Sequence, residues 1–131
     1  MNLCYKVYKK TVSGKMKSVS PHFSSIYSLH YEVGKVTRPN IGRLFVFNTA
    51  ERAAEFKKHH SFAGVLLCEC GELESQRSRL CIGYWNSRNV RGFWGFGGKG
   101  LRGADLWAVT TVPSGTLSTD WVKPIQEVEE G

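Results

Sequence analysis

The chain has 131 residues, the usual size of one domain, and its 41% hydrophobic and 22% charged residues exclude an intrinsically disordered chain. No apolar run approaches the roughly 18 residues of a membrane-spanning helix, and the N-terminus lacks the apolar core of a signal peptide. The formal net charge of +7 favours an anionic partner. We therefore expect a single domain over residues 1–131, cytoplasmic and without a membrane partner.

The positive charge is gathered in two segments that contain no acidic residue. The first precedes Glu32 and contains Lys6, Lys9, Lys10, Lys15 and Lys17. The second covers residues 75–104 and contains Arg77, Arg79, Arg88, Arg91, Lys99 and Arg102. A field of one sign attracts nucleic acid or nucleotides, and it acts mainly on association rate and non-specific affinity. The N-terminal lysines have a second interpretation, in which they only keep a hairpin soluble.

The first third of the chain predicts strands joined by turns. Within residues 3–10 the apolar series Leu3, Tyr5 and Val7 alternates with the series Cys4, Lys6 and Tyr8. This period of two is typical of a strand. The Ser13-Gly14 pair predicts a tight turn, so a return strand would complete a hairpin. Alternation resumes over 26–33, and a proline and a glycine predict a loop over 37–42.

The middle of the chain predicts a strand, a helix and a second strand. Residues 43–47 form a continuous apolar run of strand length, which favours a central strand buried on both faces. Asn48 and Glu51 have the spacing of a capping box, and the small and apolar residues that follow gather on one side of a helix at about 49–59. Residues 63–73 predict the next strand.

The last third predicts further strands. An exposed loop is expected over 73–79, and strands are expected over 80–85 and 105–112. Residues 121–128 predict an edge strand, because Pro124 has no N–H to donate. Together these elements predict the α+β class, with a mixed or mostly antiparallel sheet and the one principal helix packed against it.

The segment "RGFWGFGGKGLRG", residues 91–103, combines glycine with aromatic and cationic side chains. Glycine lets a backbone approach a ligand, aromatic rings offer stacking surfaces, and arginine and lysine neutralise phosphate. Two interpretations stay open: Phe93, Trp94 and Phe96 fill the core from a glycine-rich hairpin, or the segment is a loop that contacts a ligand. In the second interpretation the ligand-binding residues are Trp85, Arg88, Arg91, Trp94, Lys99 and Arg102.

The cysteines Cys4, Cys68, Cys70 and Cys81 are expected to be free thiols, because a chain of this size and apolar content needs no disulfides. The spacing disfavours a zinc site. Cys68 and Cys70 stand two apart in a predicted strand, whereas structural zinc sites usually draw on a C-x-x-C turn. No serine or cysteine carries a nucleophile signature. We expect no metal and no cofactor, and the sequence names no catalytic residue.

The stretches "GRLFVFNTAERAAEF" and "GVLLCECGEL", within residues 42–73, resemble the strand–helix–strand core of ADP-ribosyltransferase-like folds. Many phage and mobile-element proteins of unknown function look similar, and they pair such a core with a C-terminal segment like residues 115–128. The resemblance implies an NAD-dependent enzyme, in which Tyr5, Tyr27, Tyr31 or His30 would line the cleft.

These observations favour a non-enzymatic binding protein for an anionic partner, either nucleic acid or a nucleotide-type ligand. We expect it to be an accessory protein of a phage or mobile element. Two alternatives from other classes stay open, namely an ADP-ribosyltransferase-like enzyme and a module that binds another protein. The sequence also leaves open a homo-oligomer.

Overall fold

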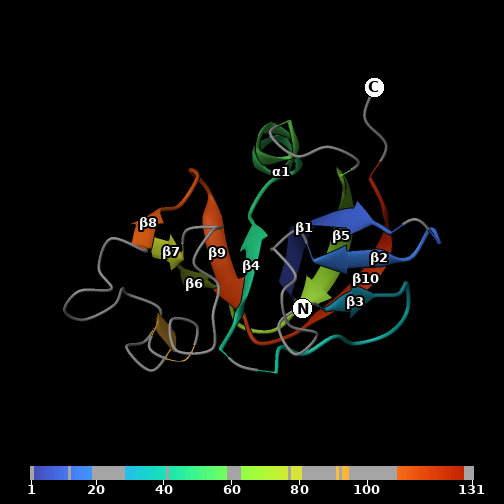
Figure 1. Cartoon of the computed structure of the whole chain (residues 1–131), viewed down its shortest axis with the longest axis horizontal. Coiled ribbons are helices and arrows are strands. Elements are labelled where there is room, and N and C mark those ends of the chain that lie inside the picture. Colours follow the sequence, from blue (N-terminus) through green and yellow to red (C-terminus); the bar gives the residue numbers. More distant parts are fainter. Residues whose placement is uncertain are drawn as a thin grey trace.

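The computed structural model describes residues 2–11, 13–18, 29–40, 42–58, 63–76, 78–80, 91, 93–94 and 109–128. The described residues form a sheet that curls into a half-barrel, with helix α1 (Ala50–Lys57) above one face (Figure 1). Strands dominate the described residues, and helix α1 has only eight residues. The predicted α+β class with a principal helix at 49–59 is therefore wrong, because strand pairing and not helix packing organises the chain.

Ten strands are described, and several are short. They are β1 (Asn2–Lys10), β2 (Met16–Ser18), β3 (His30–Tyr31), β4 (Leu44–Phe47), β5 (Ala63–Cys70), β6 (Glu74–Ser75), β7 (Ser78–Leu80), β8 (Val109–Thr111), β9 (Thr116–Thr119) and β10 (Val122–Glu127). The main sheet has the order β10-β5-β1-β4-β9-β6, and β2 joins it by pairing with both β1 and β3. The pairings are antiparallel, including that of the separate pair β7-β8.

Strand β1 is the centre of the sheet. One of its edges pairs with β5 along nearly its whole length, from Asn2↔Cys70 to Lys9↔Ala63. The other edge is shared, because β4 pairs only at Tyr5↔Phe47 and β2 takes over from Tyr8 onward. The second edge of β1 therefore splits between two partners, and the sheet begins to curl there.

Helix α1 connects two strands that lie on either side of β1. Since β4 and β5 are both antiparallel to β1, they run parallel to each other, and such a connection needs a crossover element. The helix begins at the N-cap Thr49, whose side chain accepts a hydrogen bond from the Arg52 backbone N–H at 3.2 Å. Ala53 is fully buried against the sheet, and the Phe56 ring lies 5.4 Å from that of Phe47.

Successive side chains along each strand point to opposite faces of the sheet, and this separates two apolar cores. On the helix side, Val7, Phe47, Ala53 and Val65 pack together. On the opposite, inner face of the curl a larger cluster forms, made of Cys4, Tyr8, Tyr31, Leu44, Val46, Leu66, Cys68, Cys70 and Val122. Even-numbered residues of β1 thus face the inside of the curl, and odd-numbered ones such as Val7 face the helix side.

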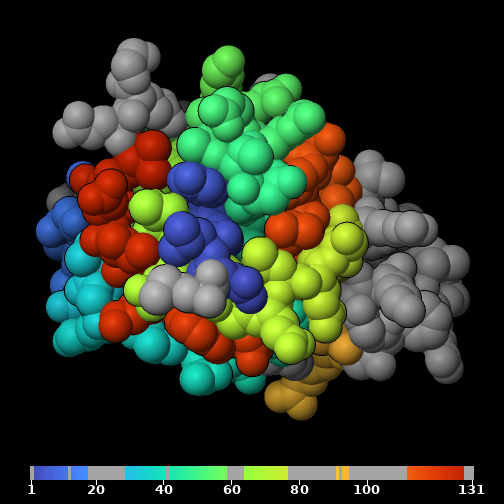
Figure 2. All heavy atoms as spheres, turned by 180° about the vertical axis from the view of Figure 1, so that it is seen from behind, coloured from blue at the N-terminus to red at the C-terminus, as the bar shows by residue number. Residues whose placement is uncertain are grey.

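The curl closes on itself where the chain leaves β3. Thr37 and Val122 exchange two backbone hydrogen bonds, of 2.8 and 3.0 Å, and the Gly34 N–H donates to the Pro124 carbonyl at 2.9 Å. Figure 2 shows the cyan atoms of this segment beside the red atoms of β10. Strands β1, β2 and β3, residues 34–37, β10 and β5 therefore form a closed circuit around the inner core, which we call the ring.

Candidate binding surface

The predicted ligand-binding residues fall mostly outside the described part of the chain. Trp85, Arg88, Lys99 and Arg102 lie in ranges that the structure does not describe. Arg91 is described and exposed, and Trp94 is half-buried.

The two described rings of the glycine-rich segment pack against β4. Phe93 is fully buried, with its ring centroid 6.4 Å from that of Phe45. Trp94 lies 5.5 Å from Phe45 and meets Phe93 edge-on at 5.0 Å. Phe93 therefore serves the core, as one of the two sequence interpretations expects, and Trp94 keeps only part of its surface for a ligand.

A row of basic side chains crosses three neighbouring strands on the outer side of the ring. Lys9 on β1 stands directly opposite Lys17 on β2, and Lys17 stands directly opposite His30 on β3. Residues paired in this way project from the same face of a sheet, with Cβ atoms about 5 Å apart. We call Lys9, Lys17 and His30 the basic row.

The basic row has no acidic partner among the described residues. The nearby lysines that do form ion pairs are Lys10, with Glu127 at 3.5 Å, and Lys35, with Glu32 at 3.2 Å. Like charges directly opposite each other on neighbouring strands destabilise a sheet. The arrangement therefore costs folding stability unless an anion binds to it.

The turn between β1 and β2 holds the row in register. Gly14 has a φ of 85°, which glycine adopts without strain, and its N–H donates to the Thr11 carbonyl at 2.9 Å. The Thr11 N–H donates to the Lys15 carbonyl at 2.8 Å, and the Lys15 N–H donates to the Thr11 hydroxyl at 3.1 Å. This network sets Lys9 opposite Lys17, a pairing that the sequence analysis missed. The lysines on both sides of the Ser13-Gly14 turn were the signal that could have found it.

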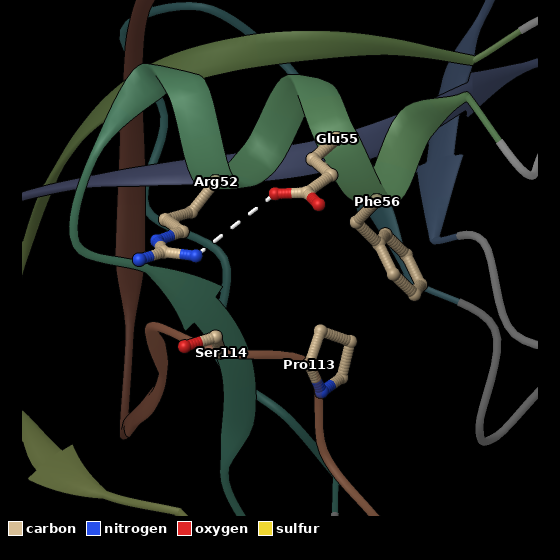
Figure 3. A pocket seen from close by; sticks show the side chains of 5 residues that line it. All are labelled: Arg52, Glu55, Phe56, Pro113 and Ser114. Atoms are coloured by element: carbon tan, nitrogen blue, oxygen red, sulfur yellow. Dashed lines mark ion pairs between the residues drawn. The ribbon is translucent and has the colours of Figure 1, made fainter.

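A hollow of about 230 Å³ lies between α1 and the turn before β9 (Figure 3). Arg52, Glu55 and Phe56 line it from the helix, and Pro113 and Ser114 line it from the turn. It is smaller than typical ligand sites, which hold about 300–1,000 Å³. Its one cation, Arg52, already lies 4.0 Å from Glu55. The hollow is a weaker candidate than the basic row.

The described thiols are buried and form no metal centre. Cys4, Cys68 and Cys70 are free, and no group of three or more potential metal ligands occurs among the residues that the structure describes. Burial is the largest cause that raises the pKa of Cys70 to about 12. Such a thiol stays protonated at neutral pH and is a poor nucleophile. Cys81 lies outside the described residues.

Comparisons of the chain with protein-family models, with curated proteins and with solved structures give no match. The resemblance of residues 42–73 to ADP-ribosyltransferase-like cores therefore stays a prediction. In the described part of the chain, no helix has the length and apolar character needed to cross a membrane.

Proposed function

We propose that this protein binds an anionic, phosphate-bearing partner, and that the basic row contacts the phosphates. The observation that carries the proposal is the register of β1, β2 and β3, which sets Lys9, Lys17 and His30 side by side without an acidic partner in the described chain. The net charge of +7 supports it, since a field of one sign draws anions to the surface.

The extent of the row favours nucleic acid over a single nucleotide. Neighbouring strands lie about 4.8 Å apart, so three strands spread the basic groups over roughly 10 Å. One phosphate group would engage only part of such a row, whereas a polyanion can meet all of it. Exposed Arg91 and half-buried Trp94 supply a further cation and a ring in the segment where the sequence predicts a ligand.

The proposal predicts that the row contributes a measurable part of the salt dependence of binding. The variant Lys9→Gln/Lys17→Gln should bind a labelled 12-nucleotide single-stranded DNA more weakly than the wild-type protein. The slope of log affinity against log salt should fall by about 1.4, because each phosphate contact contributes about 0.7. Fluorescence anisotropy between 50 and 200 mM salt measures both quantities.

The matched control is Arg38→Gln/Lys58→Gln, which also removes two positive charges, but from exposed positions outside the row. It should retain most of the wild-type slope. Equal weakening by both double variants would mean that net charge alone attracts the DNA, and the row would lose its role. Binding of ATP without binding of DNA would identify the partner as a nucleotide. Absence of both would overturn the proposal.

A further inference from the structure

His30 is the member of the basic row whose charge depends on pH. It is exposed on β3 and stands directly opposite Lys17 of β2, which in turn stands opposite Lys9 of β1. Histidine is the residue type that gains or loses a proton between pH 5 and 8, whereas lysine ordinarily keeps its charge throughout that range. The row therefore combines two fixed cations with one that a change of pH adds or removes.

The charged groups around His30 leave its imidazole available to an anion. On β2 its neighbour is the Lys17 ammonium, which cannot accept a hydrogen bond. The Thr37 hydroxyl donates to the His30 backbone carbonyl at 3.0 Å, a contact that does not use the imidazole. Glu32, two residues further along the chain, already lies 3.2 Å from Lys35. In the described part of the chain no carboxylate pairs with the imidazole.

Protonation of His30 and binding of an anion should favour each other. In the free protein a charged imidazole stands opposite the Lys17 ammonium, and like charges directly opposite on neighbouring strands destabilise a sheet. A phosphate group that meets both side chains removes this repulsion and accepts a hydrogen bond from each. Thermodynamic linkage then requires that the proton strengthens phosphate binding by the same factor by which phosphate favours the proton.

We propose that His30 makes the basic row a pH-dependent surface, which binds a phosphate-bearing polyanion more tightly in mildly acidic than in mildly alkaline solution. The inference rests on the proposed function, because it describes how the same row is regulated. The sign follows from the charge: as the pH falls from 8 to 5.5, the imidazole takes up a proton and the row gains its third cation. One added phosphate contact should also steepen the slope of log affinity against log salt by about 0.7.

Other groups of the protein also change their charge in this pH range, and the test has to separate them from His30. Desolvation lowers the pKa of Lys6 to about 8, and Lys6 projects from the face of β1 opposite to the row. The other histidines of the chain, His22, His59 and His60, lie outside the described residues. A substitution at His30 leaves all of these groups in place, so a difference in pH dependence between variant and wild type belongs to His30.

The experiment measures the affinity for a 12-nucleotide thymidine oligomer at pH 5.5 and at pH 8, at constant ionic strength. Fluorescence anisotropy with a pH-insensitive label reports it. The wild-type protein should gain about fivefold more affinity at pH 5.5 than His30→Gln gains, the size expected for one ion contact at an exposed site. His30→Lys, which is charged at both pH values, should bind at pH 8 about as tightly as the wild-type protein binds at pH 5.5.

A second measurement follows the imidazole itself. The ring C–H signals of His30 in NMR spectra move as the ring gains its proton, and their absence from the spectrum of His30→Gln assigns them. By linkage, a fivefold effect on affinity requires that the bound oligomer raises the midpoint of this titration by about 0.7 pH unit.

The outcomes separate this inference from the proposed function. Equal pH dependence of wild type and His30→Gln would overturn the inference, and so would a midpoint that the oligomer does not raise. In both cases the comparison with Lys9→Gln/Lys17→Gln still decides the proposed function. Absence of binding at both pH values would overturn the proposed function and the inference together. If His30→Gln does not fold, the NMR titration of the wild-type protein decides alone.

Discussion

At the scale of single residues, Gly42 determines where a tryptophan can lie. Its φ is 70°, in the left-handed region that favours glycine, and a Cβ on it would lie 2.1 Å from Cγ of Trp94. The indole therefore packs directly on the backbone, between this glycine and Phe45. The sequence identifies Gly42 only as a loop residue, because the contact joins positions far apart in the chain.

We expect Gly42→Ala to lower stability and to displace Trp94. Gly14→Ala is the matched control, because Gly14 has a similar φ of 85° and a Cβ on it would have no atom within 4 Å. The control introduces only backbone strain, of order 1 kcal/mol. Thermal denaturation should show the larger loss for Gly42→Ala, and a red shift of tryptophan emission should accompany it. Equal losses in the two variants would argue against the packing of Trp94 on Gly42.

At the scale of elements, β1 and β10 are tied together across the end of the ring. The Tyr8 hydroxyl donates to Oε1 of Glu127 at 2.5 Å, and Lys10 lies 3.5 Å from the same oxygen. The hydrogen bond from Tyr8 is the largest cause that lowers the pKa of Glu127, and Lys10 adds to it. The Tyr8 ring also covers Gly64 on β5, where a Cβ would lie 2.5 Å from the ring.

This contact should make stability depend on pH in the acid range. The pKa of Glu127 is lower in the folded protein than its unfolded value of about 4.5. The ionised carboxylate therefore adds stability at pH values above 4.5, and this stability is lost as the pH falls through the lowered pKa of the folded state. Tyr8→Phe keeps the ring over Gly64 but loses the hydrogen bond. Its deficit in unfolding free energy should be about 1 kcal/mol or less at pH 7 and should shrink by pH 3. Urea denaturation at both pH values measures it, and a deficit that does not change with pH would contradict the assignment.

Long, strongly patterned elements could be predicted from the sequence, and short ones could not. The strand expected over 3–10 is confirmed as Asn2–Lys10, and the run 43–47 is confirmed as Leu44–Phe47. The segment 73–79, expected as a loop, contains all of β6 and the first two residues of β7. Strands of two or three residues are too short to show alternation, and their partners define them.

The error in fold class has the same physical origin. The capping signal and the small residues near 49–59 indicate a helix, but the helix is described as only eight residues, Ala50–Lys57. The many short strands carry little pattern of their own, so the sheet is underestimated when the sequence is read alone. The basic row escapes prediction for a related reason, because it depends on the register that pairs β2 with β1 and with β3.

At the scale of the whole molecule, the ring is closed by a contact between residues 85 positions apart, Thr37 and Val122. If the closure belongs to the stable structure, its amides should resist hydrogen exchange as strongly as those of β5. The Lys35 N–H, which donates to the Glu32 carbonyl in a local turn, should exchange much faster. Exchange of the Thr37 and Val122 amides at the rate of Lys35 would mean that the ring opens without global unfolding. Amide exchange followed by NMR resolves these positions.

The closure also has a consequence for how copies of this chain meet one another. A bare strand edge is a template on which a second chain can add its own strand and begin to aggregate. On β10, the Val122 N–H and the Pro124 carbonyl already form hydrogen bonds with residues 34–37, and Pro124 has no N–H to offer. A bulge between Pro124 and Gln126 also interrupts the pairing of β10 with β5. At the other end of the sheet order, β6 is two residues long and begins with the charged Glu74. The described sheet thus leaves little edge for another strand, and the contact that encloses the inner core also protects the protein from polymerising through β10.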